Sequence, residues 1–243
     1  MSDSHSAGAA FERLVDIMDT LRSPGGCPWD AEQTHESLVR YLIEEAYEVV
    51  EAIEAPEGVN TDLLREELGD VLLQVVFHSR VAAERSAELG GFDIIAVINH
   101  LCDKLERRHP HVFDESVSSD IRDVNARWDE LKKAEKPERT GVFDGIPPHL
   151  PALAYTEKAL SKSSKASIDL PGFAQRHTQQ TPETDALTTA QTQWAARAFE
   201  LVIEARELGI DPEQALRVFT RASMVFAENN ESACGGKTEK AGA

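Results

Sequence analysis

Cysteine is scarce in this sequence. Only Cys27, Cys102 and Cys234 occur among 243 residues, and no two of them form a C-x-x-C pair. An odd number of widely separated cysteines is typical neither of a disulfide framework nor of a zinc site. We therefore interpret all three as free thiols.

Long apolar runs are absent as well. The first ten residues, MSDSHSAGAA, contain no basic segment followed by an apolar stretch, as a secretion signal would. No segment approaches the roughly 18 apolar residues that a membrane-spanning helix needs. The sequence therefore predicts a cytoplasmic protein that does not interact with membranes.

Positive charge is also in short supply. Lys and Arg number 25 against 43 Asp and Glu, which gives a formal net charge of -18. Such a surface repels polyanions, so a nucleic-acid-binding protein is disfavoured. A small phosphate ligand stays possible, because a local basic cluster and bound divalent cations can reverse the field inside one cleft.

Apolar residues recur at helical spacing through the first half of the chain. This pattern predicts helices and essentially no strand, and the short connections favour an antiparallel all-α bundle. Stop signals such as Pro24-Gly25-Gly26 and Gly90-Gly91 separate the helices. The expected spans are 7–22, 35–55, 60–88, 92–108 and 119–135.

Composition changes after the first 136 residues. Residues 137–189 are rich in proline and polar side chains, which predicts a connector and linker. An amphipathic segment interrupted at Gly209 follows over residues 190–227, and residues 228–243 are typical of a disordered tail. We therefore expect one helical domain over residues 1–136 and a shorter helical segment beyond the linker.

Two acidic pairs at i, i+3 spacing lie on neighbouring predicted helices. Glu45 and Glu48 belong to one helix, and Glu67 and Asp70 belong to the next; we call these four residues the acidic quartet. At about 100° per residue, each pair falls at the edge of its helix's apolar face rather than opposite it. Four carboxylates at the rim of a core repel one another, and partial burial raises their pKa values unless a cation lies between them.

The chemistry of the quartet points to a divalent cation. All-oxygen ligands favour Mg²⁺, with Mn²⁺ as a possible substitute, over zinc. Mg²⁺ usually keeps water ligands and contacts substrate phosphates, so the quartet predicts phosphoryl or pyrophosphoryl chemistry. One alternative is that the acids are merely solvated. A di-iron bundle is the other, but it requires Glu-x-x-His on two helices, and the fourth residue here is Glu48 or Asp70.

One dense basic group stands out in this acidic chain. Lys104, Arg107 and Arg108 are spaced i, i+3, i+4 and so share a helix face. They fit two roles that are compatible. Arg and Lys can bind a triphosphate, with bidentate contacts from Arg, and cations also stabilise the carboxyl end of a helix through its dipole.

Trp128 lies on the predicted fifth helix, with Lys132 one turn later. An indole at this place fits either stacking on a base or filling the core of the bundle. The residue pattern leaves both readings open.

Four blocks of sequence carry a resemblance to a known family. In order, they are GGCPWDAEQTHESLVRYLIEEAYEVVEAI, LREELGDVLLQVVFHSRVA, DKLERRHPHVF and ARWDELKKAEK. Together they resemble the MazG family of nucleoside triphosphate pyrophosphohydrolases over about residues 10–136. The family's acidic signature, ExxE followed by ExxD, is met by the acidic quartet.

The resemblance implies a MazG-like helical domain that forms a homodimer and binds Mg²⁺ through the quartet. It implies hydrolysis of a (deoxy)nucleoside triphosphate to the monophosphate and pyrophosphate, in nucleotide-pool housekeeping. Glu44 matches a further acidic position of the motif, where it could orient the attacking water. The residues that the resemblance assigns to substrate binding are Lys104, Arg107, Arg108, Trp128 and Lys132.

Residues 190–227 resemble the back half of the second motif copy that longer bacterial members carry. Gln193 and Ala196 replace the expected acids, and no basic cluster accompanies them. We therefore expect a degenerate helical remnant without a metal site. The alternative to an enzyme is a nucleotide-binding regulatory module that kept the fold with little turnover, and the intact quartet favours the enzyme.

Overall fold

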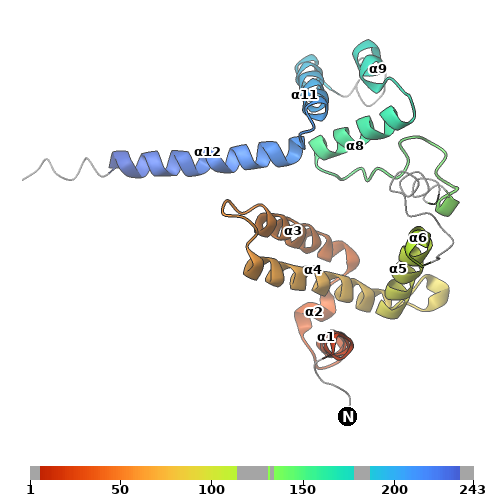
Figure 1. Ribbon diagram of the computed structural model, residues 1–243. Coiled ribbons are helices and arrows are strands. Elements are labelled where there is room, and N and C mark those ends of the chain that lie inside the picture. Colours follow the sequence, from red (N-terminus) through yellow and green to blue (C-terminus); the bar gives the residue numbers. More distant parts are fainter. Residues whose placement is uncertain (1–5, 114–130, 132–133, 178–186, 236–243) are drawn as a thin grey trace, which may run out of the picture. The chain divides into compact units, whose positions relative to one another are not determined.

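The structure is a computed structural model, and it describes residues 6–113, 131, 134–177 and 187–235. These residues form helices, turns and loops, with no strand among them (Figure 1). The prediction of an all-helical chain is confirmed. None of the described helices is both long enough and apolar enough to cross a membrane. The chain divides into two compact units, residues 1–128 and residues 129–243.

The first unit contains a helix at each of the first four places where the sequence predicts one. Its described elements are α1 (Ala7–Arg22), α2 (Pro28–Glu32), α3 (His35–Ile53), α4 (Thr61–Ala82), a 3₁₀ turn (Ala87–Leu89), α5 (Ile94–Arg108) and α6 (Pro110–Phe113). The predicted helix over residues 119–135 falls almost entirely outside the described residues.

Local capping explains where the predicted boundaries shift. The helix expected over 60–88 ends at Ala82, and a separate 3₁₀ turn follows that is closed by Gly90 at a φ of 80°. α5 begins later than expected because the Asp93 side chain accepts a hydrogen bond from the Ala96 N–H over 2.9 Å. The sequence pattern missed α2, because five residues are too few to show a helical period.

A short turn makes α3 and α4 an antiparallel hairpin. Gly58 in this turn has a φ of 98°, in the left-handed region that favours glycine. Asn60 then begins α4: its backbone N–H donates to the Ala52 carbonyl over 2.8 Å, and its side chain accepts from the Leu63 N–H over 3.2 Å. The Ala52 side chain is completely buried, so the two helices approach closely beside the turn.

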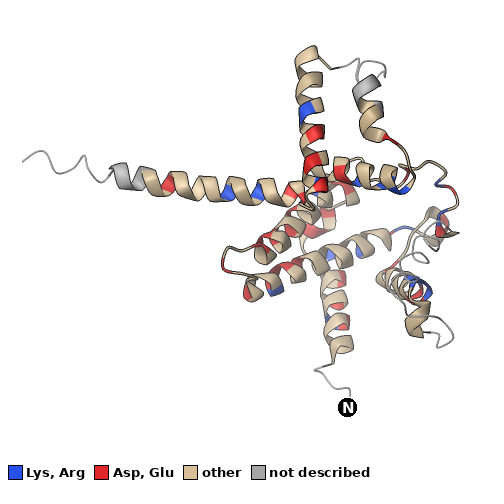
Figure 2. Ribbon diagram, turned by 45° about the horizontal axis from the view of Figure 1, so that its top comes forward, with Lys and Arg blue, Asp and Glu red and all other residues tan. Residues whose placement is uncertain are grey.

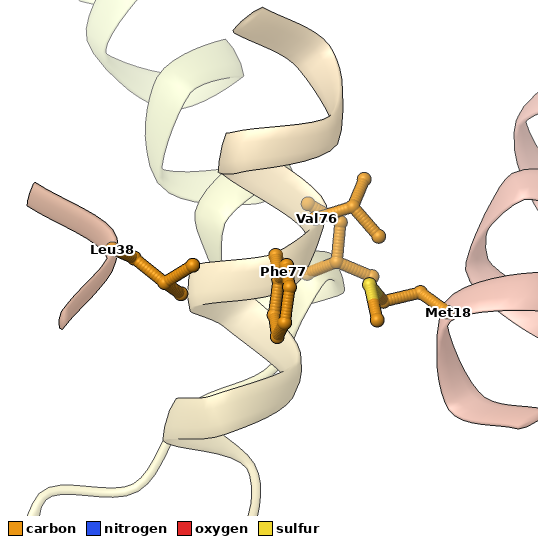
Figure 3. Close-up of a cluster of buried hydrophobic side chains, with 5 residues drawn as sticks. Met18, Leu38, Val76 and Phe77 are labelled. Carbon is orange, nitrogen blue, oxygen red and sulfur yellow. The ribbon is translucent and has the colours of Figure 1, made fainter. Parts of the chain in front are cut away.

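The core of the first unit lies around the second half of α4. Its buried side chains are Met18, Leu38, Val76, Phe77 and Ile94. Figure 3 shows Met18 of α1 and Leu38 of α3 approaching α4 from opposite sides, with Phe77 in the middle. In Figure 1, α1 is seen nearly end-on where α3 and α4 lie across the view, so α1 crosses the hairpin. Each such side chain contributes about 1.5–3 kcal/mol when buried, which fixes α3 against α4.

A buried arginine ties the end of α1 to the end of α4. The Arg22 side chain is 3% exposed and donates to both carboxylate oxygens of Glu84, over 2.8 and 2.9 Å. It also donates to the backbone carbonyls of Gln33 and Asp30, and it lies over the Phe77 ring. The hydrogen bond from Arg22 lowers the pKa of the Glu84 carboxyl. The ion pair between Arg22 and Glu84 therefore links α1 to the open end of the hairpin.

The second unit contains helices where the sequence predicts a linker. Its described helices are α8 (Ala152–Lys165), α9 (Leu170–His177), α11 (Thr189–Glu207) and α12 (Pro212–Gly235). Residues 137–189, for which the sequence predicts a connector and polar linker, thus include α8 and α9. α12 also continues into the segment that was expected to be a disordered tail.

Packing explains why α8 forms within a polar segment. Leu160 of α8 and Val202 of α11 are buried, and Glu157 of α8 pairs with Arg206 of α11 over 2.7 Å. Tertiary contacts of this kind stabilise helices whose own propensity is modest. The break between α11 and α12 includes Gly209, at a φ of 69°.

Candidate metal centre

The antiparallel register of α3 and α4 brings the acidic quartet together. Each step toward the start of α3 is matched by an equal step toward the end of α4, so Glu48 faces Glu67 and Glu45 faces Asp70. Carboxylate oxygens of Glu45, Glu67 and Asp70 all lie within 4.8 Å of one another. Glu48 lies close enough to both Glu45 and Glu67 to raise the pKa of each carboxyl. Two acidic pairs that are distant in the sequence thus form one group.

The quartet is crowded and partly shielded from water. Glu67 is only 7% exposed, and the other three acids are partly buried. Burial, the hydrogen bond with Glu48 and the nearby charge of Asp70 raise the pKa of Glu45 to about 7. Burial and the charge of Glu48 also raise the pKa of Glu67. Without a cation, Glu45 therefore keeps its proton to a higher pH than an exposed glutamate does.

The donor set fits a divalent cation that prefers oxygen. The carboxylate oxygens of Glu45, Glu67 and Asp70, which lie within 4.8 Å of one another, are the atoms that would hold such an ion. Burial and other carboxyls are the strongest influences on the pKa values of Glu45 and Glu67, with no Lys or Arg among them. Figure 2 shows acidic residues gathered along α3 and α4. Within the described part of the chain, this is the one group of three or more ligand-type side chains that could hold a metal ion.

The other predicted site residues lie apart from this group. Glu44 is exposed on α3, beside Glu45. Lys104, Arg107 and Arg108 lie near the end of α5, and Lys104 is ten residues beyond the core residue Ile94, or about 15 Å along the helix. Two more predicted substrate-binding residues, Trp128 and Lys132, lie outside the described residues.

Sequence reasoning missed a polar contact at the open end of the same hairpin. Nδ1 of His35, the first residue of α3, lies 2.8 Å from Nδ1 of His78 on α4. The available signal was the register itself: His35 precedes Glu45 by ten residues, and His78 follows Asp70 by eight. A hairpin that pairs the acids therefore brings the two histidines to the same end of the hairpin, within one helical turn of each other.

Comparison with known proteins decides the family. Residues 33–113, which include α3, α4 and the quartet, match the family described as the MazG nucleotide pyrophosphohydrolase domain. The chain is 42% identical over 222 residues to "Nucleoside triphosphate pyrophosphohydrolase/pyrophosphatase MazG" of Thermotoga maritima, covering 88% of this chain and 83% of that protein. The chain belongs to the MazG family.

Other relatives carry similar names. "Nucleoside triphosphate pyrophosphohydrolase" of Escherichia coli K12 is 42% identical over 162 residues, which cover 65% of this chain and 59% of that protein. The protein of the same name from Mycolicibacterium smegmatis is 46% identical over 163 residues, covering 65% of this chain and 48% of that protein. The crystal structure of a MazG-related protein from Thermotoga maritima, at 30% identity, covers 50% of this chain and 98% of that one, with a TM-score of 0.41. The resemblance seen in the sequence of this MazG chain is thus confirmed.

Replacing Glu45 by Gln tests the crowding of the quartet. The folded state raises the pKa of Glu45 from 4.5 to about 7, so the stability gained from its protonated form is present at low pH and is lost as the pH rises through 7. In EDTA at pH 8, we expect the Glu45→Gln variant to melt about 3 °C above the wild type. At pH 5 the two proteins should melt at nearly the same temperature. Scanning calorimetry measures both values.

Glu51→Gln is the matched control, because Glu51 is exposed on the same helix. It should leave the melting temperature within about 1 °C of the wild type at both pH values. A Glu45→Gln protein that melts at or below the wild-type temperature at pH 8 would show that the carboxyls do not repel one another.

Proposed function

We propose that this MazG-family chain is a Mg²⁺-dependent nucleoside triphosphate pyrophosphohydrolase. It hydrolyses (deoxy)nucleoside triphosphates to the monophosphate and pyrophosphate, in nucleotide-pool housekeeping. The observation that carries the proposal is the convergence of Glu45, Glu67 and Asp70, with Glu48 beside them, in a family whose relatives bear this name.

The quartet is the proposed ligand set for Mg²⁺, with Mn²⁺ as a substitute. When bound, such a cation supplies positive charge to phosphate oxygens and lowers the pKa of a water molecule. Glu48, whose proximity raises the pKa of both Glu45 and Glu67, is assigned to the same ligand set. We assign Glu44 the orientation of the attacking water, because it is the adjacent carboxylate on α3 and is exposed.

Substrate binding requires cations, because the quartet by itself repels a triphosphate. Lys104, Arg107 and Arg108 are the proposed contacts to the triphosphate, since they are basic residues grouped at the end of one helix. We further assign Trp128 and Lys132 to substrate binding on the strength of the sequence motif alone.

The enzymatic proposal is tested with purified protein, Mg²⁺ and each ribo- and deoxynucleoside triphosphate. Pyrophosphate and the monophosphate should appear in equal amounts. Asp70→Asn should lower kcat about 1,000-fold, because it removes a metal ligand. The exposed Asp62 on the same helix provides the control, and Asp62→Asn should keep kcat within about twofold of the wild type.

Two results would contradict the proposal. Orthophosphate in place of pyrophosphate would mean that a different bond is cut. Nucleotide binding without any hydrolysis would favour the second candidate, a regulatory nucleotide-binding module that kept the fold.

A homodimer is part of the same proposal. The α3–α4 hairpin carries an apolar stripe whose side chains are 38–52% exposed: Leu42, Ile43, Leu68, Leu72 and Val75. At about 100° per residue, the apolar residues of α3 and those of α4 both lie on the same side of the quartet. They therefore form one face. An exposed apolar face of this extent marks an interface, and a second copy of the chain covers it symmetrically.

Ile43→Glu combined with Leu72→Glu tests this interface. Wild-type protein should sediment as a dimer at micromolar concentration, and the double variant should sediment as a monomer, because two buried acids per protomer oppose association. Helicity by circular dichroism should not change, since both positions are exposed within one protomer. A monomeric wild type, or a double variant that still dimerises, would refute the assignment of this face.

We assign residues 190–227 to a degenerate remnant of a second copy. Gln193 and Ala196 stand where the motif has acids. Among the described residues of the second unit, no group of ligand-type side chains accompanies them. On this proposal, residues 1–136 form the single catalytic domain.

A further inference from the structure

The two histidines at the open end of the hairpin are held in an unusual geometry. The rings of His35 and His78 are nearly parallel, at an interplanar angle of 4°, with centres 5.2 Å apart. Their Nδ1 atoms are 2.8 Å apart, within hydrogen-bond distance. Nε2 of His78 is buried and has no hydrogen-bond partner in the described part of the chain.

This geometry selects one arrangement of protons. A 2.8 Å contact between two Nδ1 atoms needs one proton between them. An N–H on the buried Nε2 of His78 would be an orphaned donor, which costs more than a bare lone pair. His78 therefore donates from Nδ1 to Nδ1 of His35, and both rings are neutral.

Adding a further proton breaks this arrangement by either route. A proton on Nδ1 of His35 places two N–H groups face to face, unless His78 moves its own proton to Nε2, where the buried N–H has no partner. A proton on Nε2 of His78 gives a charged ring with an unpartnered donor in the same buried place. Every added proton thus leaves a donor N–H without an acceptor, and the neutral pair is the favoured form.

The pair occupies the end of the same register that aligns the acidic quartet. Leu38, one turn inward from His35, and Phe77, the residue before His78, belong to the same core cluster. His78 is eight residues beyond Asp70, or about 12 Å along α4. Ala52 and Asn60 fix the hairpin at its turn, and the histidines fix it at the other end.

We propose that His35 and His78 are positioning residues that form an acid-sensitive clasp between α3 and α4. While the clasp is neutral, it holds the register that brings the four carboxylates together. Protonation releases the start of α3 from α4 and loosens the quartet. The consequence for metal binding rests on the proposed function, whereas the clasp itself does not.

The charged groups near the two histidines act on a protonated His35 in opposite directions. Glu36, beside His35, has a lowered pKa that reflects hydrogen bonds first and then His35 and Arg85, and it attracts a protonated His35. Arg85 opposes it. Arg22 also lies at this end of the hairpin, but it is paired with Glu84.

Burial and the proximity of His35 lower the pKa of His78 below its ordinary value of 6.5. The unfolded chain therefore binds the proton more readily than the folded one. The stabilising contribution is complete above pH 6.5, and it is lost as the pH falls through the lower pKa of the folded state.

The test uses the full chain and a double variant, His35→Asn with His78→Asn. An Asn amide lies close to the place of Nδ1 and can keep a hydrogen bond without titrating. Between pH 7.5 and 5.5 in EDTA, we expect the wild type to lose about 5 °C more in melting temperature than the double variant. His100→Asn, at an exposed position on α5, should follow the wild type.

Mn²⁺ binding, measured by electron paramagnetic resonance, reports on whether the clasp positions the acidic quartet. The ratio of Kd at pH 5.5 to Kd at pH 7.5 should be several-fold larger in the wild type than in the double variant. If Mn²⁺ fails to bind the wild type at all, the proposed function fails, and the melting experiment still decides the clasp.

A purely structural contact would lower the melting temperature of the double variant equally at every pH, and that result would overturn the clasp. Should the double variant not fold, nitrogen-15 spectra of wild-type histidines decide instead. His78 should show the Nδ1–H form and should stay neutral below pH 6.5. The Nε2–H form, or protonation at the pH of free imidazole, would overturn the proposal.

Discussion

Repulsion among the four carboxylates of the acidic quartet is the constraint on which the first unit depends. Four acids gathered on a single α-helical hairpin would separate unless other contacts held the helices in register. The packing of Leu38 against Phe77, with Met18 from α1, does so. Five core side chains, at about 1.5–3 kcal/mol each when buried, oppose this repulsion. Burial first, and then the neighbouring carboxyls, raise the pKa of Glu45.

The same balance explains why the site is prepared for a metal ion. The fold supplies the free energy that brings the quartet together, and the carboxylates are left in need of positive charge. No Lys or Arg is among the groups that shift the pKa values of Glu45 and Glu67. On the proposed function, a divalent cation is what supplies this charge to the group.

Much of this account could be predicted from the sequence, and the remainder depends on three-dimensional geometry. The acidic pairs and the four main helices follow from periods of three and four residues, which are local properties. α8 was missed because its formation depends on packing against α11, and α2 because it is too short. The contact between His35 and His78 depends on the register, which the length of the turn at Gly58 sets.

We propose that the quartet binds a divalent cation in exchange for protons. The most direct measurement of this exchange is the proton release on adding MgCl₂ to the unbuffered protein at pH 7. Because the raised pKa values of Glu45 and Glu67 keep protons on the quartet that a cation displaces, we expect on the order of one proton to be released per ion bound. The Glu45→Gln variant should release clearly fewer. Tight Mg²⁺ binding by the wild type without proton release would contradict the account.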